Sequence, residues 1–168
     1  MNKCVFLDRD GVLNRERGDY TYEVEDFDLL PGVVDALKRL KDRGYLLIVI
    51  TNQAGISKGR YDRFQMEACH LYLQKSCDDC IDAIYYCPYH PTISSSISRK
   101  PDTLMFEKAI AKFSIDPTQS WMIGDKERDI IPANKFGINT VLIEENTSST
   151  IADYTSKSLH KAVLDIIL

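Results

Sequence analysis

The sequence lacks an excess of basic residues, a long hydrophobic run and an even number of cysteines. Its 168 residues include 21 Lys and Arg against 25 Asp and Glu, which gives a net charge of -4. A polyanionic partner normally requires a basic face, so we expect neither a nucleic-acid nor a membrane partner. No stretch approaches the roughly 20 apolar residues of a membrane span, and no signal-peptide pattern is seen near Met1. These features predict a cytoplasmic location.

The five cysteines are odd in number and unevenly spaced, which favours reduced thiols over a disulfide framework. With 44% hydrophobic and 27% charged residues, the composition is that of an ordinary globular protein. A chain of 168 residues is long enough for one domain with a real core and too short for two substantial ones. We therefore predict a single domain over 1–168, and we favour a monomer over an oligomer.

Short apolar runs alternate with helical patterns, which is typical of βαβ units. Strands are predicted at 4–7, 46–50, 81–86, 121–123 and 140–143. Helices are predicted at 31–43, 60–78, 103–113, in a segment ending at 136, and at 158–168. The prediction is an α/β fold, a three-layer sandwich with a Rossmann-like, mostly parallel sheet and helices on both faces. No large cap domain is expected, because the chain between Gly11 and Thr51 has room only for a flap and one helix.

The predicted helix at 60–78 has a periodic set of residues of its own. Within 60–78, Phe64, Ala68, Leu71 and Lys75 recur at helical spacing. His70 in this segment is expected only on the helix surface, and we expect the same of His160 in the terminal helix.

Two carboxylates follow the first predicted strand. Asp8 and Asp10 are one residue apart, and Gly11 after them allows the backbone to turn back over a bound ion. In α/β sheets, ligands bind at the carboxyl ends of strands. Such a pair suits phosphoryl transfer, with Asp8 as nucleophile and Asp10 as acid and base. Taken alone, Asp-x-Asp-Gly is more often simply a turn.

Three further strand ends carry polar side chains. Thr51 follows the second strand, Lys100 stands in the loop after the third, and Asp125 and Asp129 follow the fourth. In a parallel sheet these ends meet at one edge, so distant positions can form one site. Each has a plainer interpretation: Thr51 as a cap or turn hydroxyl, Lys100 as a solvated charge, and Asp129 as a favourable charge in the first turn of a helix.

The ordered set resembles the haloacid dehalogenase (HAD) superfamily, whose four motifs are Asp-x-Asp-Gly, a Ser or Thr after the second strand, a Lys, and Gly-Asp-x-x-x-Asp. The resemblance spans residues 4 to about 145. The residues in and around these motifs are more specific still, and they are similar to those of the branch that contains heptose bisphosphate phosphatases and histidinol-phosphate phosphatases. The matching segments are LDRDG at 7–11, TNQAGI at 51–56, YYCP at 85–88, RKP at 99–101 and GDK at 124–126.

The resemblance implies a Mg2+-dependent phosphomonoester hydrolase that works through an aspartyl-phosphate. Asp8 and Asp125, with the main-chain carbonyl of Asp10, would hold Mg2+. Lys100 would neutralise phosphoryl oxygens and Thr51 would position them. Asp10 would protonate the leaving alkoxide and then activate water.

In the same family, Asp129 would hydrogen-bond near the metal rather than bind it. Arg99 would contact a second phosphate or a sugar oxygen of the substrate. Further substrate contacts are implied for Glu16, Arg17, Asn52, Gln53 and Lys126.

The expected partner is a small phosphorylated substrate, with a sugar bisphosphate favoured. Heptose 1,7-bisphosphate is the first choice, and histidinol phosphate or a generic sugar phosphate is the alternative. A DNA 3′-phosphatase is disfavoured by the acidic balance of the chain. A catalytically inactive binding subunit is also conceivable, but it would have no need for a buried cluster of like charges.

The loop at 88–101 departs from the branch pattern. The branch holds a structural zinc there with Cys-x-His and a later Cys-x-Cys. This chain has Cys87-Pro88-Tyr89 and Ser96-Ile97-Ser98 at those positions, so one ligand of four is kept. Neutral hydroxyls are poor zinc ligands, and we expect the loop to fold without zinc.

Overall fold

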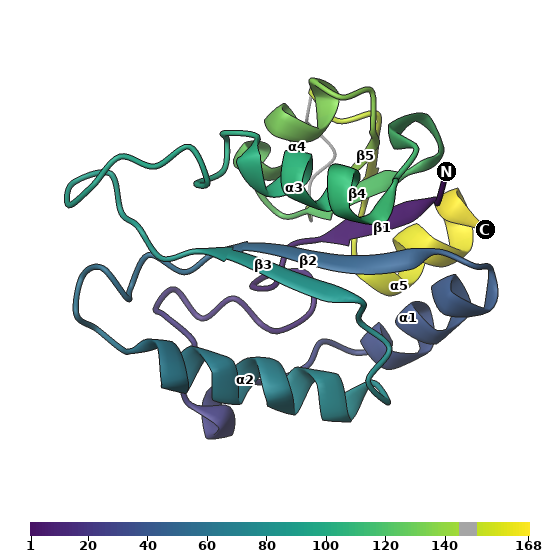
Figure 1. The fold of residues 1–168 in the computed structure, drawn as a ribbon. Helices are drawn as coiled ribbons and strands as arrows, with labels where there is room; N and C mark the ends of the chain where they lie inside the picture. The colour runs from purple at the N-terminus through teal and green to yellow at the C-terminus, as the bar shows by residue number, and fades with distance from the viewer. Residues whose placement is uncertain (145–150) are drawn as a thin grey trace.

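A six-stranded sheet is the centre of the computed structural model, which describes residues 1–144 and 151–168 (Figure 1). Its order is β3-β2-β1-β4-β5-β6, and every pairing within it is parallel. The strands are β1 (Cys4–Leu7), β2 (Leu46–Asn52), β3 (Ala83–Cys87), β4 (Trp121–Gly124), β5 (Asn139–Ile143) and β6 (Tyr154–Ser156).

Helices cover both faces of the sheet. They are α1 (Val33–Asp42), α2 (Arg63–Ser76), α3 (Leu104–Phe113), α4 (Glu127–Asn134) and α5 (Leu159–Ala162). Three short turns of helix are η1 (Val24–Asp26), η2 (Pro117–Gln119) and the π-helical η3 (Val163–Ile167). Helices α1, α2 and α5 lie on one face, and α3 and α4 lie on the other (Figure 1). The predicted α/β sandwich is confirmed, and no helix in the described residues is long and apolar enough to cross a bilayer.

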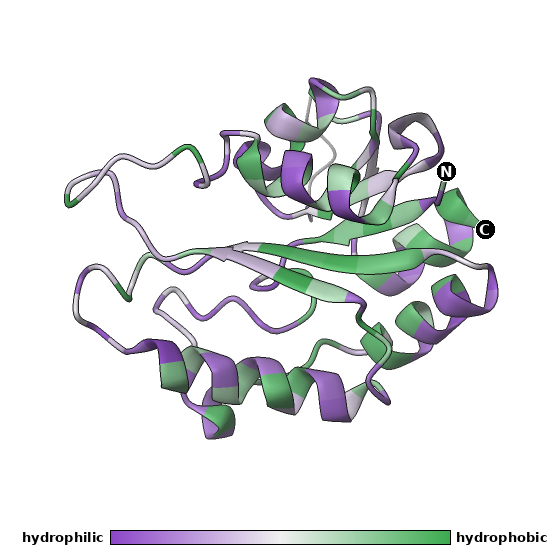
Figure 2. Ribbon diagram, in the orientation of Figure 1, coloured by the Kyte–Doolittle hydropathy of each residue, from purple (hydrophilic) through white to green (hydrophobic). Residues whose placement is uncertain are grey.

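Strand β1 feeds both hydrophobic cores because successive side chains of a strand point to opposite faces. Val5 and Leu7 pack in the core under α1, α2 and α5. Cys4 and Phe6 pack in the second core, with α3 and the end of α4. All four side chains have no exposed surface, and the sheet is the most continuously hydrophobic part of the ribbon (Figure 2).

The strand order creates a crevice at one edge of the sheet. Strand β1 pairs with β2 on one side and with β4 on the other. The connections through α1 and α2 run over one face, and those through α3 and α4 run over the opposite face. Where connections diverge in this way, ligands bind outside the carboxyl ends of the strands. Asp8 follows β1 at this point, and Asp125 follows β4.

The bounds of α2 differ from the predicted 60–78, and local capping explains both ends. The Asp62 side chain accepts a hydrogen bond from the Gln65 amide, and the Gln65 side chain accepts one from the Asp62 amide. This reciprocal capping box starts the helix at Arg63. At the other end, Asp78 and Asp79 have φ of 55° and 53°, a left-handed conformation that stops the helix.

The predicted apolar face of α2 was wrong. Phe64 is 77% exposed and Leu71 is 60% exposed. The buried residues are Met66, Cys69, His70 and Leu73. Two positions along a helix rotate the side chain by about 200°, so a pattern started two residues too early lies on the opposite face.

His70 was therefore also misplaced, because it is buried rather than on the helix surface. His160 is half-buried on α5, and its Nε2 lies 3.0 Å from Asp35 Oδ2 of α1. Strand β6 was not predicted, because three residues give no usable alternation of polar and apolar side chains. The predicted terminal helix is divided into α5 and η3.

Protonation of His70 should destabilise the fold. Burial, followed by the Arg9 guanidinium, lowers the pKa of His70 to about 3 from the ordinary 6.5. The unfolded chain then binds a proton that the folded chain excludes, so stability falls as the pH drops below 6.5. By about pH 4.5, this group alone should cost about 2–3 kcal/mol.

Urea unfolding of the wild type and of His70→Gln at several pH values measures this effect. The other acidic groups titrate in both proteins, so the difference between the two curves isolates His70. We expect the variant to lose less stability below pH 6.5. Parallel curves would show that His70 titrates as a solvated side chain.

Candidate active site

Lys100 is the central cation of the site and is completely buried. Its Nζ lies 2.9 Å from Asp8 Oδ1 and 2.7 Å from Asp129 Oδ1, and it donates to the Ile50 carbonyl at 2.6 Å. The Asp8 carboxylate also accepts a hydrogen bond from the Arg9 amide at 2.8 Å. One hydrogen bond and two ion pairs of this ammonium thus join the end of β1, strand β2 and helix α4 to the loop after β3.

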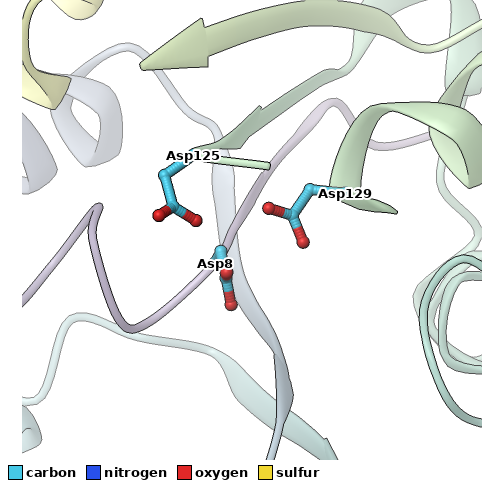
Figure 3. A group of neighbouring side chains, drawn as sticks. All are labelled: Asp8, Asp125 and Asp129. Atoms are coloured by element: carbon cyan, nitrogen blue, oxygen red, sulfur yellow. The ribbon is translucent and has the colours of Figure 1, made fainter. Parts of the chain in front are cut away.

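Asp8, Asp125 and Asp129 form a cluster of carboxylates at this edge of the sheet. Each offers an oxygen that lies within 4.8 Å of the others, and Figure 3 shows the carboxylates of Asp125 and Asp129 turned toward Asp8. Asp125 follows β4 and pairs with Lys126 Nζ at 2.8 Å. Asp129 lies in the first turn of α4 with no exposed surface.

Crowding and burial shift the pKa values in the cluster. Burial first, and then the Asp129 charge, raise the pKa of Asp8 to about 7. Burial likewise raises the pKa of Asp125. For Lys100, burial favours the neutral amine, but the carboxylates of Asp129 and Asp8 outweigh it and raise the pKa. The cluster carries more negative charge than Lys100 neutralises, so a second cation would stabilise it.

The donor atoms fit a hard divalent cation. Asp125 Oδ1 is buried and has no hydrogen-bond partner among the described residues. Asp129 Oδ1 also has no hydrogen-bond partner among the described residues, but it lies 2.7 Å from Lys100 Nζ in an ion pair, and Oδ2 accepts from the Lys126 amide at 3.1 Å. Asp8 and Asp125 are thus better placed than Asp129 to bind an ion, and carboxylate oxygens are the ligands that Mg2+ prefers.

Two glycines allow these groups to approach one another. Gly11 has φ of 87°, and a Cβ there would collide with Asp125 Oδ2. A Cβ on Gly124 would collide with the Asp129 side chain. The glycines of both motifs are therefore needed to bring the carboxylates together.

Asp10 points into a separate hydrogen-bond network. Its Oδ1 accepts from Arg9 Nη2 at 3.0 Å and Asn14 Nδ2 at 2.9 Å, and its Oδ2 accepts from Arg9 Nε and Gln53 Nε2 at 3.2 Å each. Burial by itself would raise the pKa of Asp10, but the Arg9 charge and these hydrogen bonds outweigh burial and lower it. The structure holds Asp10 as a carboxylate, the form that accepts a proton.

Thr51 and Gln53 connect this network to β2. Thr51 is 1% exposed, and its Oγ1 accepts from Gln53 Nε2 at 2.9 Å. The side-chain oxygen of Gln53, Oε1, in turn accepts from the Tyr61 hydroxyl at 2.6 Å. Because a Cβ on Gly55 would strike the Tyr61 ring, the turn after β2 also fixes the position of Tyr61.

A small cavity of about 100 Å3 opens above these groups. Water occupies about 30 Å3 in the liquid, so this space suits a phosphoryl group and not a whole sugar phosphate. The lining residues are Asp8, Arg9, Asp10, Glu16, Asp19, Tyr20, Thr21, Thr51, Asn52, Gln53 and Arg128.

A wider cavity of about 450 Å3 is lined by Glu16, Asp19, Tyr20 and Arg128, which also line the small one, and by Gly18 and Lys126. A third, of about 860 Å3, lies beside Asp125 and reaches α5. The four shared residues make the wider cavity the outer continuation of the phosphoryl-sized one.

The predicted substrate residues have different surroundings. Glu16 and Lys126 line the wider cavity, and Asn52 and Gln53 line the small one. The Asn52 side chain exchanges two hydrogen bonds of 3.1 Å with the main chain of Lys100, so it also fixes that loop.

Two predicted arginines have partners of their own. Arg17 lines none of these three cavities and pairs with Asp26 at 2.6 Å. Arg99 is half-buried, and its Nη1 donates to the Tyr89 carbonyl at 3.1 Å. The positive charge of Arg128 lies near enough to contribute to a lowered pKa of Arg99, after the larger effect of burial.

Sequence reasoning missed Arg9, Arg128 and Tyr20, which all line the small cavity. Arg9 stands between Asp8 and Asp10 in the sequence, and a basic residue at that position could have indicated a side chain that pairs with one of the two carboxylates. Arg128 lies within the Gly-Asp-x-x-x-Asp motif at a variable position, and Tyr20 lies in the segment without clear periodicity. Neither carries a pattern that indicates a direction for its side chain.

The altered loop brings the four zinc-motif positions into local contacts. Ser96 Oγ and Ser98 Oγ lie 2.8 Å apart, and Cys87 Sγ lies 4.0 Å from the Tyr89 carbonyl oxygen. The expectation that this loop binds no zinc stays a prediction.

Comparison with known proteins identifies the family. Residues 97–165 match the family model described as HAD-hydrolase-like. D-glycero-beta-D-manno-heptose-1,7-bisphosphate 7-phosphatase of Haemophilus ducreyi is 38% identical, over 93% of this chain and 90% of that protein. The protein of the same name from Haemophilus influenzae is 39% identical, over 95% of this chain and 94% of that protein.

Solved structures share the fold. D,D-heptose 1,7-bisphosphate phosphatase from B. bronchiseptica, complexed with magnesium and phosphate, aligns with a TM-score of 0.87 and 24% identity, over 96% of both chains. The corresponding phosphatase from Burkholderia thailandensis aligns with a TM-score of 0.70 and 26% identity, over 98% of this chain and 97% of that one. The resemblance predicted from the motifs is confirmed, and the chain belongs to the HAD-like hydrolase family.

Proposed function

We propose that this chain is a Mg2+-dependent phosphomonoester hydrolase that removes the 7-phosphate of D-glycero-D-manno-heptose 1,7-bisphosphate through an aspartyl-phosphate on Asp8. The observation that supports this most directly is the cluster of Asp8, Asp125 and Asp129, in which the buried Lys100 pairs with Asp8 and Asp129 and Asp8 lines a cavity of phosphoryl size. The names of the relatives at 38% and 39% identity support the substrate. We further propose that one domain carries the whole site; its cytoplasmic location and monomeric state stay predictions.

Asp8 and Asp125 would hold the ion, with the main-chain carbonyl of Asp10 as a further ligand. When bound, Mg2+ supplies positive charge that lets a carboxylate approach an anionic phosphoryl group. Asp125 Oδ1 favours this assignment because it is buried without a partner among the described residues. Asp129 would act through its contacts with Lys100 and the Lys126 amide rather than as a ligand.

In the first step, an oxygen of Asp8 attacks phosphorus and the bond to the sugar oxygen breaks. Asp10 gives a proton to the departing alkoxide, for which it must first be protonated. Lys100 opposes the negative charge that develops on the phosphoryl oxygens, and the Thr51 hydroxyl orients them.

In the second step, Asp10 takes a proton from water as the water attacks phosphorus. The bond to Asp8 breaks, which releases phosphate and restores both carboxyl groups. The contacts from Arg9, Asn14 and Gln53 stabilise the carboxylate form of Asp10 that this step requires.

The outer cavity favours a substrate with a second anionic group. Lys126 and Arg128 supply positive charge there, and Arg128 has no salt bridge within the described parts of the chain. Arg99, Asn52, Gln53 and Glu16 would contact substrate as the family pattern implies; Arg17 could do so only after leaving Asp26.

Histidinol phosphate is the second candidate, because the same cavity contains carboxylates of Glu16 and Asp19 that could face an amine. Asp19 lies 3.7 Å from Arg60, however, which reduces its attraction for a cationic substrate. We therefore favour the bisphosphate over this candidate.

Phosphate release from heptose 1,7-bisphosphate and from histidinol phosphate, each with Mg2+ and with a chelator, tests the proposal. We expect kcat/KM to be at least about tenfold higher for the bisphosphate, the preference that one additional charged contact supplies. The chelator should abolish turnover of both. Equal, feeble rates would indicate a generic sugar phosphatase, and no turnover of any phosphomonoester would contradict the enzymatic function.

Asp8→Asn should abolish turnover, by a factor on the order of 10³ or more, because an amide cannot form the acyl phosphate. The fold should survive without metal, since the change removes one charge from a crowded buried cluster while Lys100 keeps Asp129. Phosphate release and thermal unfolding measure the two effects. Asp42→Asn, at an exposed position at the end of α1, is the matched control. Full activity in Asp8→Asn would exclude Asp8 as the nucleophile.

Mg2+ should raise the Tm of the wild type without any substrate present. A ligand at one hundred times its Kd stabilises the folded state by about 2.7 kcal/mol, which for a chain of this size corresponds to a shift of several degrees. Asp125→Asn should lose most of the shift, and Asp42→Asn should keep it. An undiminished shift in Asp125→Asn would place the ion elsewhere.

A further inference from the structure

The Arg9 guanidinium is deeply buried, and the mechanism above uses only its charge beside Asp10. Arg9 is 1% exposed and is among the largest fully buried side chains of the protein. A buried charge is tolerated only where it is paired and hydrogen-bonded. Its partners therefore indicate what the residue does.

One side of the guanidinium forms two hydrogen bonds with the Asp10 carboxylate. Arg9 Nη2 lies 3.0 Å from Asp10 Oδ1, and Arg9 Nε lies 3.2 Å from Asp10 Oδ2. A two-point contact of this kind fixes the direction of a carboxylate as well as its position, which a lysine could not do.

The other side is held by groups far apart in the sequence. Nη2 donates to the Thr21 carbonyl at 2.8 Å, and Nη1 lies 3.4 Å from His70 Nε2 on α2. The carbon of the guanidinium lies 5.5 Å from the centre of the Phe27 ring. Since arginine only donates, Nε2 of His70 must be the acceptor and the ring must be neutral.

Resting on the proposed function, we propose that Arg9 is a positioning residue, held by His70 and Thr21, that orients Asp10 for proton transfer. Thr21 and Phe27 belong to the segment between β1 and α1 that lines the mouth of the site. The same guanidinium thus ties that segment and helix α2 to the acid and base of the reaction.

A purely structural role would leave a different signature. A buried ion pair that only supports the fold changes stability, and its loss affects all steps through the folded fraction. A positioning role affects the steps in which Asp10 moves a proton and leaves substrate binding nearly unchanged. The two roles separate when the leaving group does not need a proton.

The test compares His70→Leu with His70→Gln on a sugar phosphate and on p-nitrophenyl phosphate. Leucine fills similar space but accepts no hydrogen bond, whereas the glutamine carbonyl can replace the acceptor. On the sugar phosphate, we expect His70→Leu to lower kcat at least about tenfold, a part of what general acid-base catalysis contributes, with KM within about twofold. His70→Gln should restore most of the rate.

On p-nitrophenyl phosphate, the first step needs no proton from Asp10 but the second step still needs a base. His70→Leu should therefore release about one nitrophenol per enzyme in a burst and then turn over slowly. Arg9→Lys keeps the charge without the two-point contact and should give the same burst if His70→Leu folds poorly. Circular dichroism and thermal unfolding report the folded fraction.

The outcomes separate the two proposals. A wild type that hydrolyses neither substrate would overturn the proposed function and this inference with it. An active wild type, with folded His70→Leu and Arg9→Lys matching it in kcat and lacking a burst, would overturn the inference alone. Equal loss in His70→Leu and His70→Gln would also overturn it, because the acceptor would then be irrelevant.

Discussion

The structure of the site depends on the buried contact between Lys100 and the carboxylates of Asp8 and Asp129. The Lys100 ammonium donates a hydrogen bond to the Ile50 carbonyl and forms ion pairs with Asp8 and Asp129. The partners come from the end of β1, from α4 and from β2, so one side chain fixes the relative positions of three elements. A buried charge is stable only where it is paired, so the electrostatics and the architecture of the site depend on each other.

Lys100 alone does not neutralise the negative charge of the three carboxylates in the cluster. Three carboxylates each offer an oxygen within 4.8 Å of the others, and the raised pKa values of Asp8 and Asp125 reflect burial together with repulsion by the Asp129 charge. Gly11 and Gly124 make the crowding sterically possible, since side chains there would push Asp125 and Asp129 away. The fold therefore maintains a negative cluster at the point where the connections of β1 and β4 diverge, and a divalent cation bound there would relieve the repulsion.

The positions of Asp8, Thr51, Lys100 and Asp125 could be predicted from the sequence because strand ends determine them. A buried apolar run shows where a strand ends, and parallel pairing brings these strand ends to one edge of the sheet. The surroundings of Asp10 could not be predicted, because they depend on the rotation of α2 and on the course of a segment without periodicity. An error of two residues in the phase of α2 placed His70 on the surface, although it lies beside Arg9 in the structure.

The edge of the sheet and the loops around it contribute different parts of the site. The phosphoryl-sized cavity includes residues fixed by the ends of β1 and β2, while the wider cavity is lined by Glu16, Gly18, Asp19, Tyr20, Lys126 and Arg128. Asp8 and Thr51 thus depend on the sheet for their positions, and the loops that line the wider cavity can vary without moving Asp8. Asp10 is the exception, because Arg9 joins its carboxylate to the main chain of Thr21. A displacement of the segment around Thr21 would therefore move the carboxylate that we propose to transfer the proton, so this segment and the proposed catalytic groups are structurally coupled.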